Sequence, residues 1–293
     1  MLVETLPKTF AQLVKISGLS HGTDVWTTNA QDLVGGVTEF GAIPFKDIIG
    51  CRDDIMVDLM YDGLDPSMAF KIMEFVRKGK AGKDPAGWAK FKTEMEAKNV
   101  PAWYIWSCER IKYMFPKAHA TAYVLMALRV AWFKVNAPKL FYSGWFSKRA
   151  AAHHVQAYLG GKMAIKAAME EIENLPKRTA TDDDKYTALQ VALEMTLRGI
   201  KFLPVDINKS SATIFEIEEG GLRIPFAAVQ SLGPNIAYDI VEKRNEKPFS
   251  SKKDVMKRTR LNQTLFEVFD VMHAFGDLPD EDLEESEGLF AFA

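Results

Sequence analysis

The chain has 293 residues, 47% of them hydrophobic and 26% charged, with a formal net charge of −2. This length provides one large or two ordinary domains with an ample core, and the composition excludes a disordered or disulfide-stabilised protein. The first residues lack the cationic and apolar regions of a signal peptide. The most apolar stretch, residues 122–133, is interrupted by Arg129 and too short for a bilayer, so we predict a cytoplasmic protein without membrane contact.

Residues 8–200 have the periodicity of successive helices, and a glycine-rich elbow separates the first two. The elbow, residues 17–23, contains two glycines, several hydroxyl side chains and His21. Glycine permits a close approach of backbone N–H groups to a ligand, but most elbows of this kind are simple turns, and both interpretations stay open. Farther along, Asp53 and Asp54 are adjacent and point in different directions on a helix. We therefore predict that they favour a helix N-terminus and do not share a metal ion.

A long apolar helix is predicted over residues 118–136, and two basic residues, Lys117 and His119, stand at its beginning. Backbone N–H groups are unpaired there and the helix dipole is positive, so these side chains form a receptor for an anion such as phosphate. A purely structural helix start usually carries Asp or Glu in that turn. The alternative is a buried helix with a solvated start, and this run of residues alone does not separate the two.

The pattern changes after Gly199. Three short segments rich in β-branched residues follow, at 201–205, 213–218 and 222–224, with Gly220 and Gly221 as a hairpin turn. A compact helical unit is predicted after Pro225. The fold class is therefore mainly α, with helices first, then a small β-containing connector, then a helical DNA-binding domain of the kind described next.

Residues 226–244 have the layout of a helix-hairpin-helix, in which a first helix leads into a Leu-Gly-Pro-Asn turn and a second helix. The hairpin glycine permits approach to a DNA phosphate, and N–H groups at the second helix start bind phosphate without reading sequence. A degenerate second copy is predicted over residues 255–271. An ordinary corner between two helices is the alternative. The predicted DNA-binding residues are Leu232, Gly233, Asn235, Ile236, Lys243, Arg244, Lys252 and Lys253.

The charges of the C-terminal third are unevenly distributed. Residues 243–260 contain eight Lys or Arg against two acidic residues, whereas residues 277–287 contain seven acidic residues and no basic one. A charge run is usually a solvated face. Beside the helix-hairpin-helix, however, the pattern indicates a body that binds a polyanion, followed by an acidic flexible tail.

These features together resemble the C-terminal part of the bacterial DNA polymerase III alpha subunit of the PolC type. The likeness covers nearly the whole chain and rests on five specific blocks in the same order: ISGLSHGTDVW at 16–26, IGCRDDI at 49–55, KYMFPKAHA at 112–120, ALRVAWFK at 127–134 and GDLP at 276–279. The resemblance implies that residues 1–200 are polymerase fingers that grip the incoming deoxynucleoside triphosphate. It also implies that residues 201–276 bind duplex through tandem helix-hairpin-helix elements.

The resemblance and the residue chemistry together predict seven nucleotide-binding residues. Cationic groups pair with triphosphate oxygens or the template, flat rings lie near a base, and the elbow borders the base or sugar. A satisfied buried histidine is the alternative at position 21, and a structural cation is the alternative at position 129. The seven residues are Ser17, His21, Phe115, Lys117, His119, Tyr123 and Arg129.

The chain departs from the family in two respects. Nucleotidyl transfer needs carboxylates that hold two Mg²⁺, and in this family they lie in a palm upstream of the fingers, to which nothing here corresponds. We therefore predict no catalytic residue, Mg²⁺ only in the complete polymerase, and a fragment, split-gene product or truncated chain that binds but does not polymerise. The family also ends in a peptide that binds the sliding clamp. In the acidic flexible tail predicted over residues 277–293, Leu289 and Phe290 keep the apolar plug of this peptide while Ser286 replaces its glutamine. A clamp-binding end and an unselected apolar end are the two interpretations, and both stay open.

The leading hypothesis is thus the fingers and duplex-binding part of a replicative DNA polymerase, with primer–template DNA, deoxynucleoside triphosphate, the sliding clamp and the rest of the polymerase as partners. The alternative is a non-catalytic DNA-binding or clamp-tethering protein that retains the fold. A decayed remnant is the third possibility.

Overall fold

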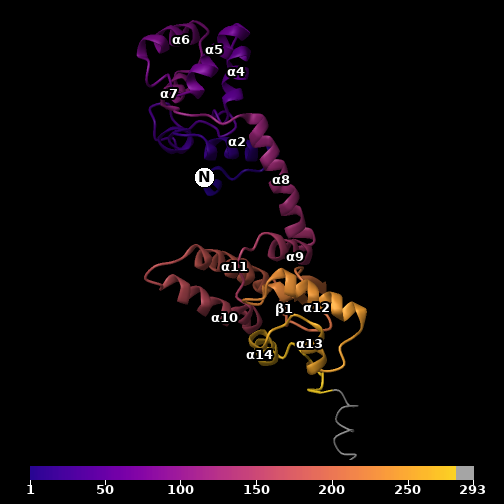
Figure 1. Cartoon of the computed structure of the whole chain (residues 1–293). Coiled ribbons are helices and arrows are strands. Elements are labelled where there is room, and N and C mark those ends of the chain that lie inside the picture. Colours follow the sequence, from indigo (N-terminus) through magenta and orange to yellow (C-terminus); the bar gives the residue numbers. More distant parts are fainter. Residues whose placement is uncertain (282–293) are drawn as a thin grey trace, which may run out of the picture. The chain divides into compact units, whose positions relative to one another are not determined.

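The computed structural model describes residues 1–281 and is mainly helical with a small three-stranded sheet, as the sequence predicts (Figure 1). The chain folds into two compact units, Met1–Val130 and Ala131–Ala293. No helix within residues 1–281 is long and apolar enough to cross a membrane.

The first unit is built from helices around a main apolar core that includes Leu33, Ile55, Ile72 and Met95, and a smaller buried cluster lies between α2 and α8. Its elements are α1 (Leu2–Thr5), α2 (Phe10–His21), the irregular π-turn η1 (Trp26–Ala30), α3 (Gln31–Gly35), α4 (Arg52–Tyr61), α5 (Pro66–Arg77), α6 (Pro85–Ala97), α7 (Ala102–Arg110) and the first part of α8 (Lys117–Asn136).

Local sequence explains where several of these helices begin. Thr9 and Gln12 form a reciprocal capping box at the start of α2. The side chains of Asp65 and Asp84 accept backbone N–H groups at the starts of α5 and α6, and a proline follows each of them at the first helical position.

The predicted elbow at residues 17–23 is largely helical, because α2 continues to His21. Gly18 lies in that helix against the backbone of residue 50. A Cβ atom there would lie 2.3 Å from the Gly50 carbonyl oxygen and 2.4 Å from Cys51 Sγ. The prediction of an open loop over Ser17–His21 was therefore wrong. Gly18 instead allows helix α2 to pack closely against residues 50 and 51, which are distant in sequence. The residues next to Gly18 in the sequence give no sign of this contact.

The second unit contains a helical hairpin, the sheet and the C-terminal helices. Its elements are α9 (Pro138–Lys148), α10 (Val155–Glu173, kinked at Gly161), α11 (Ala180–Leu197), β1 (Lys201–Leu203), β2 (Glu216–Glu218), β3 (Gly221–Arg223), the 3₁₀ turn η2 (Phe226–Ala228), α12 (Pro234–Glu246), α13 (Lys252–Arg258) and α14 (Gln263–Val271). β3 is central, parallel to β1 and antiparallel to β2.

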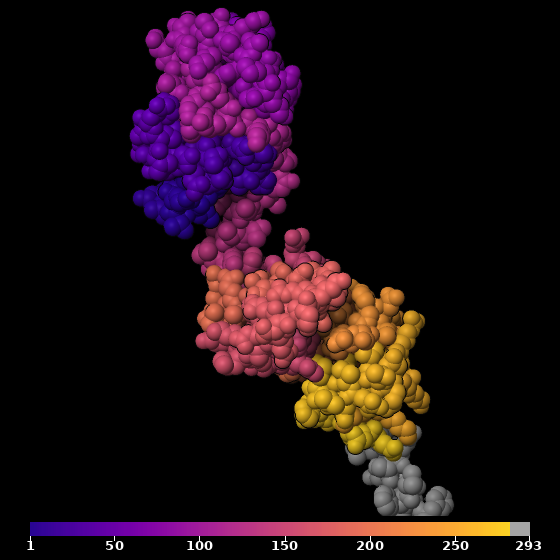
Figure 2. Space-filling model, turned by 90° about the vertical axis from the view of Figure 1, so that its left-hand side faces the viewer, coloured from indigo at the N-terminus to yellow at the C-terminus, as the bar shows by residue number. Residues whose placement is uncertain are grey.

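Aromatic side chains join the helical hairpin of this unit to the sheet. Phe202 on β1 stacks on Tyr158 of α10 with ring centroids 4.5 Å apart, and it meets Phe146 of α9 edge-on at 5.1 Å. One continuous core then extends from these rings to Phe226 and Phe269 near the C-terminal helices. In the space-filling view the segments from α10 to α14 accordingly pack together as one body (Figure 2).

The first helix predicted for the helix-hairpin-helix, beginning at Phe226, was too long. Only the 3₁₀ turn Phe226–Ala228 forms. The N–H groups of Phe226 and Ala227 donate to the carbonyl oxygens of Ser211 and Ala212, and Ser231 has a φ of 68°. These long-range bonds fix the backbone in a form that does not continue as a helix.

The boundary between compact units, at Val130 and Ala131, falls within α8. The predicted functional boundary near residue 200 lies inside the second unit. That division concerns which residues bind nucleotide and which bind duplex, and it stays a prediction.

Candidate nucleotide and DNA interfaces

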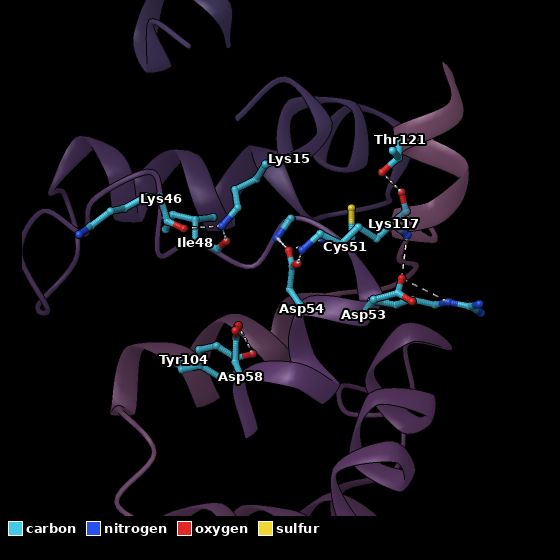
Figure 3. A network of polar contacts seen from close by, with 12 residues as sticks. Lys15, Lys46, Ile48, Cys51, Asp53, Asp54, Asp58, Tyr104, Lys117 and Thr121 are labelled. Carbon is cyan, nitrogen blue, oxygen red and sulfur yellow. Dashed lines mark hydrogen bonds and ion pairs between the residues drawn. The ribbon is translucent and has the colours of Figure 1, made fainter. Parts of the chain in front are cut away.

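The start of α8 is held by two consecutive carboxylates of α4. Asp53 Oδ2 accepts the backbone N–H of Lys117 at 2.7 Å, and Asp54 Oδ1 lies 2.7 Å from Lys117 Nζ (Figure 3). The other oxygen of Asp54 accepts the N–H groups of Gly50 and Cys51, each at 3.0 Å, at the start of its own helix. Asp54 thus caps its own helix, as the sequence predicts, whereas Asp53 binds the start of α8, which the sequence did not predict. They supply the negative charge that the first turn of α8 itself lacks.

A cavity of about 480 Å³ opens beside the Lys117–Asp54 pair. Its charged wall residues are three lysines and four aspartates, so opposite charges nearly balance: Lys15, Lys46, Lys117, Asp47, Asp54, Asp58 and Asp62. Tyr61, Trp103 and Tyr104 add aromatic surface. Of the three lysines, Lys117 forms an ion pair with Asp54, whereas Lys15 donates to backbone carbonyl oxygens.

Several ionisable groups of this cavity have perturbed pKa values, among them Lys15, Asp58 and Lys117. Lys15 Nζ donates to the carbonyl oxygens of Lys46 and Ile48, and burial lowers its pKa despite the nearby aspartates (Figure 3). The Tyr104 hydroxyl donates to Asp58 Oδ2 at 3.0 Å, and burial raises the pKa of that carboxyl group against the effect of this hydrogen bond. For Lys117, the hydrogen bond to Asp54 raises the pKa, so the ammonium stays charged at neutral pH.

Four of the predicted nucleotide-binding residues form a ladder of rings between the end of α2 and the start of α8. His21 stacks on Phe115 with centroids 4.9 Å apart, Phe115 meets His119 at 5.0 Å, and His119 meets Tyr123 at 4.6 Å. The carbonyl oxygen of Ser17 bonds His21 Nδ1 at 2.8 Å and orients the first ring. Because His21, His119 and Tyr123 are exposed, the ladder presents flat aromatic faces to solvent.

The seven predicted nucleotide-binding residues divide into three places. Ser17, His21, Phe115, His119 and Tyr123 belong to the ring ladder, whereas Lys117 lines the cavity and pairs with Asp54. Arg129 is exposed on α8, about 18 Å along the helix axis from Lys117 at 1.5 Å per residue. Neither His119 nor Arg129 lines the cavity, so the three cations do not share it.

The predicted DNA hairpin is present as a turn followed by α12. Leu232 is buried, and Gly233 precedes α12 without a side chain that caps the helix. A Cβ atom added at Gly233 would meet nothing within 4 Å, and φ is −71°. The glycine is therefore not required by strain or by internal packing. It leaves open space beside exposed Asn235 and half-buried Ile236 at the helix start, where a backbone phosphate could approach.

The four basic residues predicted to support duplex binding have partners within the chain. Lys243 pairs with Glu246 at 2.8 Å. Half-buried Arg244 donates to the carbonyl oxygens of Ile207 and Ser210 at 3.0 and 2.9 Å. Lys252 lies 2.8 Å from Asp270 and 2.9 Å from Asp280, and Lys253 lies 3.8 Å from Glu281. Arg244 thus joins α12 to the loop after β1. The three lysines instead form ion pairs with exposed carboxylates.

The second, degenerate copy corresponds to α13 and α14. The turn between them ends at Asn262, whose side chain accepts the N–H of Leu265 at 2.9 Å. Two helices joined by a short turn are present where the sequence predicts them. The predicted clamp-binding residues Leu289 and Phe290 lie outside the described residues.

Two family profiles match the chain. One, described as "Bacterial DNA polymerase III alpha subunit finger domain", matches residues 1–99, and a "Helix-hairpin-helix motif" matches residues 199–281. A curated relative from Thermotoga maritima, "DNA polymerase III PolC-type", is 48% identical over 280 residues. The chain corresponds to one region of PolC-type DNA polymerase III.

Further PolC-type relatives agree with this assignment. The "DNA polymerase III PolC-type" of Lacticaseibacillus paracasei is 48% identical over 293 residues, and that of Bacillus subtilis is 49% identical over 283. These alignments cover 96–99% of the chain but only 19–20% of the relatives. The chain therefore spans about a fifth of the length of the PolC-type polymerases that it matches.

Within residues 1–281, no three His, Cys, Asp or Glu side chains are placed to hold a metal ion. Asp53 and Asp54 point to different helix starts and do not converge, so they do not fit the two-Mg²⁺ site of nucleotidyl transfer.

Sequence reasoning missed several residues of the cavity, namely Lys15, Lys46, Asp58 and Tyr104. One signal could have found part of this set. Asp58 follows Asp54 by one helical turn, which places both carboxylates on the same face of α4. The lysines come from segments distant in sequence and carry no such signal.

Proposed function

We propose that this chain is the fingers and duplex-binding part of a replicative DNA polymerase. Residues 1–200 bind the incoming deoxynucleoside triphosphate, and residues 201–276 bind primer–template DNA. The observation that carries the nucleotide part is the ring ladder from His21 to Tyr123, beside the helix start that bears Lys117. The match of residues 199–281 to a helix-hairpin-helix motif supports the duplex part.

In this proposal a base stacks on the exposed rings of the ladder. Stacking of a base on an aromatic side chain is worth about 1–3 kcal/mol and does not depend strongly on base identity. Such a contact suits a polymerase, which accepts four different nucleotides. Ser17 keeps His21 in place, and Tyr123, with 61% of its surface exposed, offers the outermost ring.

Lys117 is the proposed partner of the triphosphate. Its side chain is 54% exposed, and its present partner, a carboxylate oxygen of Asp54, has the charge and hydrogen-bonding capacity of a phosphate oxygen. Exchange of one anion for the other needs only a movement of the long lysine side chain. Arg129 lies farther along α8, where contact with the template strand is the proposed role.

The duplex contacts are proposed at the start of α12. Asn235 and Ile236 offer the helix start, Gly233 offers open space, and Lys243 adds a positive charge that can exchange Glu246 for a phosphate. Lys252 and Lys253 add further phosphate contacts. These contacts hold duplex DNA without reading its sequence.

Polymerisation is proposed to require the remainder of the polymerase, which supplies the carboxylates for Mg²⁺. We also propose that Leu289 and Phe290 bind a sliding clamp. Similarity to the PolC-type polymerases supports both of these proposals. The apolar pair in the acidic C-terminal sequence supports the clamp contact alone.

Fluorescence anisotropy with a labelled primer–template duplex tests the proposal. Three lysine–phosphate contacts give a log–log salt slope of about −2.7, which is a loss of about 40-fold in affinity between 50 and 200 mM salt. The same chain should incorporate no nucleotide. Absence of duplex binding, or binding that salt does not weaken, would refute the duplex part.

Hydrogen exchange tests the nucleotide part separately. Addition of a deoxynucleoside triphosphate and primer–template should slow exchange of amides around Phe115, Lys117 and Tyr123. Inorganic triphosphate alone is the control, because it lacks the base that stacks on the rings. Unchanged exchange with every addition would remove residues 1–200 from nucleotide binding.

A non-catalytic DNA-binding or clamp-tethering protein is the second candidate. The observation in its favour is that Asp53 and Asp54 already occupy the helix start and the ammonium group of Lys117. This candidate expects duplex binding without any effect of nucleotide on hydrogen exchange, so the two experiments above separate the candidates.

A further inference from the structure

The segment after α14 turns back onto the start of α13. The Lys252 N–H donates to the carbonyl oxygen of Pro279 at 2.8 Å, and the Lys253 N–H donates to that of Asp280 at 3.1 Å. Two consecutive backbone hydrogen bonds thus fix the segment against the two lysines that the sequence assigns to duplex binding.

The side chains of the same segment pair with those lysines. Asp280 Oδ1 lies 2.9 Å from Lys252 Nζ, whose other carboxylate partner is Asp270 at 2.8 Å. Glu281 Oε1 lies 3.8 Å from Lys253 Nζ. Hydrogen bonds to Asp270 and Asp280 raise the pKa of Lys252, so its charge is present throughout the neutral range.

We propose that the acidic segment 277–281 is an autoinhibitory element that competes with duplex DNA for Lys252 and Lys253. The proposal rests on the duplex-binding function proposed above. In the free chain, carboxylates take the positions that backbone phosphates take in the complex. DNA binding then requires the segment to leave.

The strength of the contact suits a reversible competitor. The side chain of Asp280 is 85% exposed and that of Glu281 is 56% exposed. Exposed ion pairs are worth only about 0–1 kcal/mol each and are screened by salt. Four more acidic residues follow by position 287, which adds negative charge to the tethered competitor. DNA, with its high charge density, can displace such a segment.

The test compares two double variants that raise the net charge equally. D280N/E281Q removes the carboxylates that pair with the lysines. E170Q/E171Q removes two exposed carboxylates of α10 that make no ion pair within residues 1–281. Duplex affinity of the full chain is measured by anisotropy over a range of salt concentrations.

The proposal expects D280N/E281Q to bind duplex about three- to tenfold more tightly at low salt, the size expected when one or two exposed ion pairs stop competing. The gain should fall as salt rises, because salt already weakens the competing contacts. E170Q/E171Q should gain less than twofold. In a Lys252→Gln/Lys253→Gln background, D280N/E281Q should give no gain, since neither of the freed lysine contacts is then present.

Equal gains by both double variants would overturn the proposal in favour of a general effect of net charge. No gain by D280N/E281Q would overturn it as well, with the duplex-binding function still standing if all variants bind. Failure of every variant to bind duplex would refute the function and the competition together. Hydrogen exchange tests the docking of the segment separately from DNA binding. In a chain ending at Gly276, the amides of Lys252 and Lys253 should exchange faster than in the full chain.

Discussion

Replacement of Asp54 by alanine is the sharpest test of how the first unit is held together. The carboxylate is only 6% exposed and has three polar partners, the N–H groups of Gly50 and Cys51 and the ammonium of Lys117. Loss of a helix cap costs about 0.5–2 kcal/mol, and loss of a charged hydrogen bond costs about 1.5–3 kcal/mol. Since one group makes both contacts, we expect Asp54→Ala to destabilise the first unit by about 2–4 kcal/mol.

Native-state hydrogen exchange of amides in α4, α5 and α7 measures this change, because these helices belong to the first unit. Asp54→Asn should cost less, about 1–2 kcal/mol, since its amide oxygen can still accept one backbone N–H. Asp62→Ala is the matched control, as this exposed aspartate lines the same cavity and its carboxylate makes no hydrogen bond or ion pair within residues 1–281. A change below about 0.5 kcal/mol in Asp54→Ala would refute the structural role assigned to this carboxylate.

Three further outcomes are expected. Gly18→Ala should destabilise the first unit by about 1–3 kcal/mol, because the new Cβ clashes with the Gly50 carbonyl oxygen. Gly144→Ala should stabilise the second unit by about 0.5–1 kcal/mol, because this glycine lies in a helix and the new Cβ meets nothing within 4 Å. Thermal denaturation measures both changes. Burial lowers the pKa of His153 to about 4. Because the unfolded imidazole binds its proton near pH 6.5, stability should fall as pH drops from 6.5 towards 4, by about 3 kcal/mol at pH 4, and urea titrations of His153→Gln should lack this loss. Arg244→Ala should lower the unfolding free energy by about 1–3 kcal/mol, whereas Lys243→Gln should weaken duplex binding without such a loss, which parallel urea and anisotropy measurements would show.

Elements with strong local signals were predictable from the sequence. Helix α5 is one of the successive helices expected within residues 8–200, and its start has a clear local signal because Asp65 caps it and Pro66 begins it. The long helix expected over residues 118–136 is α8, which ends before Pro138. The short strands after Gly199 were also expected, and their β-branched residues and glycine turn explain why.

Features that depend on distant residues were not predictable. Gly18 suggested a loop, but its lack of a side chain serves packing against Gly50 within a helix. Phe226 suggested a helix start, but the carbonyl oxygens of Ser211 and Ala212 hold the backbone otherwise. These outcomes are set by tertiary contacts, which a local pattern cannot contain.

The candidate site shows the same division. Residue types suggested cations and rings at the start of α8, and four of those rings do meet. The pairing of Lys117 with Asp54 joins residues 63 positions apart, and no sequence pattern near either residue predicts it. Sequence therefore suggested candidate ligand-binding groups, while the structure showed that some of them already have internal partners.

The adjacency of Asp53 and Asp54 has a mechanical consequence. Neighbouring side chains on a helix point about 100° apart. Asp54 can therefore cap its own helix, α4, while Asp53 binds the backbone at the start of α8. A ligand that takes the Lys117 ammonium from Asp54 therefore removes one of the two contacts between these aspartates and the start of α8, and leaves the Asp53 contact to the backbone in place.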